Sequence, residues 1–66
     1  MNTNLFEYEM KEAGYQTPEQ RAKALGISIS AYYRRMSGEC ECSKREIGRV
    51  AEILGKEKAW RIFFAN

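Results

Sequence analysis

Histidine is absent from this chain of 66 residues, and cysteine and proline are scarce, with two residues and one. Histidine is the side chain that most often serves as a general base or a metal ligand. A chain of this length also encloses no large cleft, because small domains bury only about 60% of the surface that they expose when unfolded. We therefore expect a single domain over residues 1–66, with no enzymatic activity and no cofactor.

Long apolar runs are missing as well. No stretch approaches the roughly 20 apolar residues that a membrane-spanning helix needs. The start of the sequence, Met1 to Glu7, has neither the basic region nor the apolar run of a signal peptide. We expect a soluble, cytoplasmic protein that has no membrane partner.

Strand signals are also absent, since no segment alternates apolar and polar residues and no Asn-Gly turn occurs. Glycines instead follow segments of helical periodicity, where helix C-termini favour them. The sequence thus predicts an all-α fold of five helices, with frayed ends that include Asn66. These helices run from about Asn4 to Ala13, from Pro18 to Leu25, from about Ile29 to Ser37, from Ser43 through Leu54 and from about Lys56 onward.

The stretch Thr17–Gly38 holds two short helical patterns on either side of a sharp break. Thr17 is placed to cap the first helix, Pro18 suits its first position, and Gln20 stands three residues after the cap. Gly26 supplies the left-handed conformation that ends this helix, and Ser28 caps the next one. Two helices joined in this way are typical of a helix-turn-helix, which makes DNA the leading candidate partner.

Positive charge is concentrated in the same region. Residues 18–38 carry a net charge of +3, whereas residues 1–17 carry −2 and residues 39–66 carry +1. The basic residues of the central stretch are Arg21, Lys23, Arg34 and Arg35. Phosphate attraction favours such a distribution, although +3 over this length also lies within ordinary scatter.

The second helix of the pair presents an outer face opposite Tyr32 and Met36. Its members are Ile29, Ser30, Tyr33, Arg34 and Ser37. Arg34 can form a bidentate pair with guanine, Ile29 can contact a thymine methyl, and the serines can bond base edges or phosphate. The alternative is that Tyr33 and Arg34 only cover and solvate the helix. The preceding helix and glycine turn favour the functional interpretation.

A family resemblance rests on this region. Residues 22–28, Ala-Lys-Ala-Leu-Gly-Ile-Ser, followed by residues 30–38, Ser-Ala-Tyr-Tyr-Arg-Arg-Met-Ser-Gly, resemble the helix-turn-helix of the phage Cro/repressor (Xre) family. The segments 46–47 and 50–55 and the closing Ile-Phe-Phe of residues 62–64 are similar to small regulators encoded by phages and prophages of Gram-positive bacteria. The resemblance covers residues 5–64. It implies a five-helix, lambda-repressor-like domain that acts in a bacterial host cell.

The resemblance also implies binding to double-stranded operator DNA, usually as a homodimer and without a small-molecule ligand. Base contacts carried over by position fall on Ile29, Ser30, Tyr33 and Arg34. Phosphate contacts carried over in the same way fall on Thr17, Gln20, Ser28, Ser37 and Lys44.

Three features depart from the family pattern. Pro18 stands where a glutamine often bonds a phosphate, and Gln16 or Gln20 is left to replace it. Arg21 stands where many members have leucine, so one core contact is either lost or replaced by the arginine stem. The connection formed by residues 15–17 is one residue longer than usual. These departures concern the phosphate clamp more than the fold.

Two other clusters allow alternative interpretations. Cys40 and Cys42 cannot complete a four-ligand zinc site within one chain, so we expect reduced thiols without metal. Four cysteines shared by a dimer, or oxidation sensing, are the alternatives. Trp60, Phe63 and Phe64 either close the core, with Trp60 packed near the first or fourth helix, or leave part of the cluster exposed as a dimer interface.

A second function class competes with DNA binding. Tyrosine and arginine are enriched at protein interfaces, so the same Tyr/Arg face suits a helical protein-interaction module. Such a module would act as an antitoxin-like or anti-repressor partner. Its binding would be insensitive to salt, whereas duplex binding would weaken steeply as salt is added.

Overall fold

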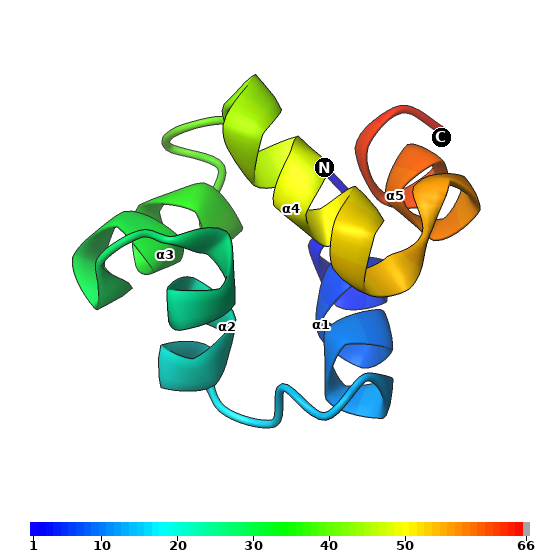
Figure 1. Ribbon diagram of the computed structural model, residues 1–66. Coiled ribbons are helices and arrows are strands. Elements are labelled where there is room, and N and C mark those ends of the chain that lie inside the picture. Colours follow the sequence, from blue (N-terminus) through cyan, green and yellow to red (C-terminus); the bar gives the residue numbers. More distant parts are fainter. Residues whose placement is uncertain (66) are drawn as a thin grey trace.

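Five α-helices form the fold of the computed structural model, which describes residues 1–65 (Figure 1). They are α1 (Thr3–Glu12), α2 (Pro18–Leu25), α3 (Ile29–Met36), α4 (Lys44–Leu54) and α5 (Lys56–Phe63). Residues 1–65 contain no strand, so the predicted all-α class is confirmed. The predicted helix ends also agree closely with the observed ones, while the prediction for Asn66 lies outside the described residues.

The α4 helix joins two parts of the fold. It packs against α5 on one side and against α2 on the other, and α2 in turn packs against α3 (Figure 1). The α1 helix lies beside α5. No helix in residues 1–65 has the length and apolar character needed to cross a lipid bilayer.

All five helices contribute side chains to one core. The fully or nearly buried apolar residues are Phe6, Met10, Ala22, Leu25, Tyr32, Val50, Ala59 and Ile62. Ala13 was predicted to end the first helix; α1 ends at Glu12 instead, and Ala13 is its exposed C-cap.

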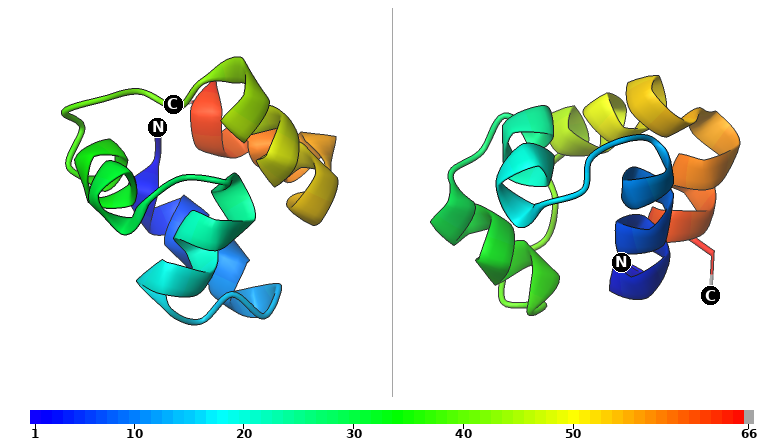
Figure 2. Two further views of the ribbon diagram at one scale, coloured as in Figure 1. Left: turned by 60° about the vertical axis from the view of Figure 1, so that its left-hand side comes forward. Right: turned by 90° about the horizontal axis from the view of Figure 1, so that it is seen from below.

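The N-terminal residues are held in place, which corrects the prediction that they fray. The Asn2 side chain caps α1, where its Oδ1 accepts a hydrogen bond of 3.0 Å from the Leu5 N–H. The Asn2 backbone N–H donates to the Ile62 carbonyl over 2.8 Å. The start of the chain therefore lies beside the last turn of α5 (Figure 2).

Helix caps follow the sequence signals. Thr17 and Gln20 form the complete capping box at the start of α2, with Pro18 just inside the helix. At the start of α4 the Ser43 Oγ accepts from the Glu46 N–H at 3.3 Å and donates to the Glu46 carboxylate at 3.0 Å. That carboxylate also accepts from Arg35 of α3, so this cap is tied to another helix.

Gly26 and Gly48 differ in backbone conformation and in the space around them. Gly26 ends α2 with φ +76°, and a Cβ at this residue would lie 3.3 Å from the Arg49 guanidinium carbon. The left-handed backbone is what favours glycine there, since the Arg49 side chain can move aside. Gly48 lies inside α4 with ordinary helical geometry, and a Cβ would meet no atom within 4 Å.

We predict that Gly48→Ala raises the free energy of unfolding by about 0.4–1 kcal/mol, because alanine has less freedom in the unfolded chain and fits the helix. Gly26→Ala, the matched control, should lower it by about 1 kcal/mol or more, since its backbone is left-handed. Urea unfolding followed by circular dichroism measures both. A Gly48→Ala variant that is less stable than the original would contradict the open geometry at this position.

Candidate functional site

The outer face of α3 is an exposed polar surface of the α2–α3 pair. Ser30, Tyr33, Arg34 and Ser37 are all exposed, and the Tyr33 side chain retains 54% of its accessible surface. Tyr32, its neighbour, is 1% exposed and stacks edge-on against the Tyr33 ring at 5.8 Å. The predicted division of α3 into an inner and an outer face is confirmed for these residues.

Ile29 differs from the rest of the predicted outer face. It is partly buried and packs against the core. Its position at the first residue of α3, directly after the tight turn, brings the apolar side chain back to the core, where burial is favourable. Only part of Ile29 is therefore available to a partner.

Three of the residues predicted to contact phosphate act as helix caps. The Thr17 hydroxyl accepts from the Gln20 N–H and the Ser28 hydroxyl from the Ala31 N–H, both over 3.1 Å. The Gln20 Oε1 accepts from the backbone N–H groups of Gln16 and Thr17, at 2.7 and 3.1 Å. Because a hydroxyl that accepts a bond still carries its own proton, Thr17 and Ser28 keep a donor for an outside acceptor.

The other two phosphate candidates lie on either side of the α3–α4 loop. Ser37 is exposed, but its hydroxyl donates to the Arg34 carbonyl over 3.0 Å, so this donor is already used. Lys44 is exposed at the first position of α4. The positive end of a helix disfavours a lysine there, and an anion would offset that repulsion.

Two of the four cations in the central stretch point inward; the sequence predicted at most a buried stem for Arg21 and predicted nothing of this kind for Arg35. Arg21 is 2% exposed and lies 3.7 Å from the Glu7 carboxylate. Arg35 forms a two-bond ion pair with Glu46, at 2.5 and 3.1 Å. Within residues 1–65, Lys23 and Arg34 are the cations of this stretch that have no ion pair. The positive charge on the surface of the α2–α3 pair is therefore smaller than the composition suggests.

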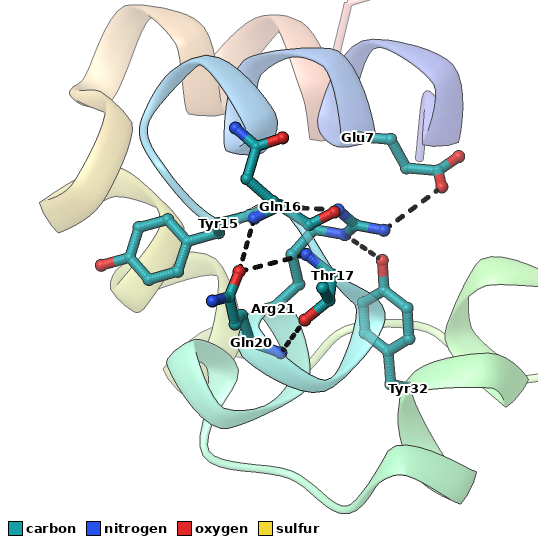
Figure 3. Close-up of polar contacts among 7 residues, drawn as sticks. All are labelled: Glu7, Tyr15, Gln16, Thr17, Gln20, Arg21 and Tyr32. Carbon is teal, nitrogen blue, oxygen red and sulfur yellow. Dashed lines mark hydrogen bonds and ion pairs between the residues drawn. The ribbon is translucent and has the colours of Figure 1, made fainter.

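Arg21 is the centre of a buried polar network (Figure 3). Its Nη1 donates to the backbone carbonyls of Tyr15 and Gln16, at 3.0 and 3.1 Å. Its Nε donates to the Tyr32 hydroxyl over 2.8 Å. One side chain thus joins the α1–α2 connection, α2 and the inner face of α3.

The Tyr32 hydroxyl accepts this bond as a neutral phenol. Burial raises its pKa above the usual value and outweighs the opposing effect of the Arg21 charge. The network is the main functional feature that the sequence analysis missed, because only the stem of Arg21 was expected to matter. The available signal was the long connection at residues 15–17, whose carbonyls require donors.

The Arg35–Glu46 pair joins the end of α3 to the start of α4. Burial alone would raise the pKa of the Glu46 carboxyl, but hydrogen bonds from Arg35 and Ser43 and the charge of Arg35 together hold this pKa below its usual value. The hydrogen bond with Glu46 likewise raises the pKa of Arg35. The pair is therefore fully charged at neutral pH.

The aromatic residues of α5 divide between core and surface. Phe63 is partly buried against the core, whereas Trp60 and Phe64 are 61% and 56% exposed. The rings of Trp60 and Phe64 lie 5.1 Å apart. The alternative in which Trp60 is packed near α1 or α4 is wrong, and part of the cluster is an exposed apolar patch.

The thiols of the α3–α4 loop are in the free form, with Cys40 exposed and Cys42 partly buried. Burial and the nearby Glu46 charge raise the pKa of the Cys42 thiol to about 11, so it is protonated at neutral pH. In residues 1–65 no group of three or more cysteine, aspartate and glutamate side chains is placed to hold a metal ion.

No protein-family model, curated protein or solved structure matches this chain. Function must therefore be argued from the geometry of the chain itself. That geometry offers one exposed polar helix face with an adjacent set of capped helix starts, and one exposed aromatic pair on α5.

We predict that Tyr32→Phe lowers the free energy of unfolding by about 1–3 kcal/mol, because it leaves the buried Arg21 Nε–H without an acceptor. The double variant Arg21→Met/Tyr32→Phe should cost less than the sum of the single changes, since it removes both partners together. Glu7→Gln is the control and should cost at most about 1 kcal/mol, because the Glu7 side chain is 41% exposed and lies 3.7 Å from Arg21. Additive costs in urea unfolding would show that the Arg21–Tyr32 bond contributes nothing.

We predict that Glu46 makes the fold sensitive to acid. Because its pKa is lower in the folded protein than in the unfolded chain, the stabilisation is complete above the unfolded value of about 4.3 and is lost as the pH falls through the folded value. Glu46→Gln should therefore flatten the acid limb of a plot of unfolding free energy against pH. Glu52→Gln, an exposed carboxylate on the same helix, should leave the slope nearly unchanged. Equal slopes for the original protein and Glu46→Gln would refute this assignment.

Proposed function

We propose that this protein is a sequence-specific DNA-binding transcriptional regulator of the phage Cro/repressor type. In this proposal α2, the turn at Gly26 and α3 form the helix-turn-helix of a lambda-repressor-like domain. The proposal rests on the exposed face of α3, which lies opposite the buried Tyr32 and is formed by Ser30, Tyr33 and Arg34. A face of this composition suits the edges of bases in a major groove.

Arg34 has the main part in base recognition. It is exposed and, within residues 1–65, has no ion pair, so its guanidinium is available for a bidentate bond to guanine. Ser30 and Tyr33 supply hydroxyl groups on the same face, one turn of helix apart. Ile29 contributes the part of its side chain that the core leaves uncovered, which suits a thymine methyl.

Phosphate contacts position the helix on the duplex. The hydroxyl protons of Thr17 and Ser28 and the amide of Gln20 lie at the starts of α2 and α3, where the helix ends also favour anions. Lys44 supplies a charge at the start of α4, and Ser37 serves only if its bond to Arg34 opens. The side-chain amide of Gln20 replaces the glutamine that Pro18 displaces.

A homodimer accounts for the exposed aromatic pair. Trp60 and Phe64 form an apolar patch on α5 that a second copy would cover, with Phe63 linking the patch to the core. A two-fold dimer would read an operator with two symmetric half-sites.

One observation favours the second candidate, a helical protein-interaction module of antitoxin-like or anti-repressor type. Arg21 and Arg35 are used inside the protein, which leaves Lys23 and Arg34 as the cations of the α2–α3 surface that have no ion pair in residues 1–65. Phosphate attraction is weaker as a result, while an exposed tyrosine beside an arginine is well suited to a protein partner.

The decisive experiment is selection of bound sequences from a random pool of duplexes, followed by affinity measurements on the selected operator. We predict that Arg34→Ala costs about 1–3 kcal/mol of binding free energy and relaxes specificity at one base pair. Arg61→Ala is the matched control, because it removes an equal charge from α5, where Arg61 pairs with Glu57 at 2.8 Å. It should leave base preference unchanged.

Each outcome of this experiment is informative. An enriched palindrome would support both DNA binding and the α5 dimer, and an enriched single half-site would support DNA binding by a monomer. Failure to enrich any sequence, combined with salt-insensitive capture of a protein through Tyr33 and Arg34, would replace the proposal with the interaction module.

A further inference from the structure

A groove of about 450 Å³ lies where the N-terminus, the end of α3, the α3–α4 loop and the end of α5 meet. Ser30, Tyr33 and Arg34 of the exposed α3 face do not line the groove, which shares only Ser37 with that face. Its lining includes four sulfur-bearing side chains, which are Met1, Met36, Cys40 and Cys42.

This concentration of sulfur is the feature that the function proposed above does not use. The chain has three methionines and two cysteines, and the remaining one of the five, Met10, is fully buried in the core. Met36, Cys40 and Cys42 lie within seven residues of sequence, and the fold brings Met1 from the start of the chain to the same groove. The sequence showed two thiols too few for zinc, but it did not show that Met1 lies beside them.

The backbone around the groove is held by hydrogen bonds. The Cys40 N–H donates to the Arg34 carbonyl over 3.2 Å, which closes the loop onto the end of α3. The Asn2 N–H donates to the Ile62 carbonyl, which fixes the residue next to Met1. In the loop itself, Cys40 and Cys42 are two residues apart, outside any helix, and both line the groove.

We propose that this groove binds one soft monovalent metal ion, Cu(I), through the thiolates of Cys40 and Cys42 and the thioether of Met36. Thiolate and thioether sulfurs select Cu(I), whereas zinc requires a closed set of four cysteine, histidine or carboxylate ligands. Binding is a proton exchange without change of oxidation state. Two S–H bonds break, three Cu–S bonds form as the ion leaves the ligands that carried it, and two protons pass to solvent.

The groove also separates Cu(I) from harder cations. Glu41 is the carboxylate on its lining, so oxygen ligands for magnesium or calcium are too few. Met1 is a second thioether within the groove and is a further candidate ligand. The site needs no second copy of the chain and does not depend on DNA binding.

The test is a titration of the reduced, full-length protein with Cu(I) under anaerobic conditions, against a chromophoric Cu(I) chelator as competitor. We expect the protein to withdraw one Cu(I) per chain from the chelator. Loss of a residue that only supports a metal ligand typically weakens binding by about 10–100-fold. Cys40→Ser and Cys42→Ser remove direct ligands, so each should weaken Cu(I) binding by more than this, and Met36→Leu should weaken it measurably. Met10→Leu is the matched control, because it removes the sulfur that lies in the core, and it should bind as the original does.

Circular dichroism of each variant checks that its helices are intact. A second titration uses Ag(I), a soft monovalent ion that does not change oxidation state. Failure to withdraw Cu(I) from the competitor would overturn the proposal. An unchanged affinity in Met36→Leu, a similar loss in Met10→Leu, or one Cu(I) per two chains would also overturn it, because each contradicts a three-sulfur site within one chain.

Discussion

The hydrogen bond between the Arg21 Nε–H and the Tyr32 hydroxyl is the contact on which the position of α3 depends. It reaches from α2 to α3 inside the core, and the same guanidinium holds the carbonyls of Tyr15 and Gln16. The α1–α2 connection at residues 15–17 has backbone acceptors that need donors, and Arg21 supplies them. One buried arginine therefore ties both this connection and α3 to α2.

This arrangement has a consequence for charge. The central stretch is rich in cations, but Arg21 and Arg35 satisfy interior acceptors, on the α1–α2 connection and on Glu46. Both pairs fix how α3 sits against its neighbours, one at its middle and one at its end. The proposed binding surface then relies less on a broad positive field and more on a few positioned groups, chiefly Arg34 and the hydroxyls beside it.

Local signals in the sequence predicted the local structure well. Caps at Thr17 and Ser28, the proline at the start of α2 and the glycine after Leu25 each act through a few neighbouring residues, so their outcome can be derived without the fold. The direction of a long polar side chain is different, because it depends on which acceptors the other helices bring near. Arg35 faces Glu46 eleven residues away; helical periodicity leaves Arg35 off the outer face that holds Arg34, but it does not identify Glu46 as the partner. The partial burial of Ile29 was not predicted for the same reason. A helical wheel gives the direction of its side chain on α3 but not the distance to the core.

The end of α3 is where the two proposals come closest in the structure. The carbonyl of Arg34, the residue proposed to read a base, accepts a hydrogen bond from the Cys40 N–H. Met36, two residues after Arg34, lines the groove. A metal ion held by Cys40 and Met36 would bridge the last turn of α3 and the loop that follows it. Thermodynamic linkage then makes the two effects equal. If bound metal changes the affinity for DNA by some factor, bound DNA changes the affinity for the metal by the same factor. Because Arg35 already fixes this turn through Glu46, that factor is close to one unless the loop shifts when the groove is filled.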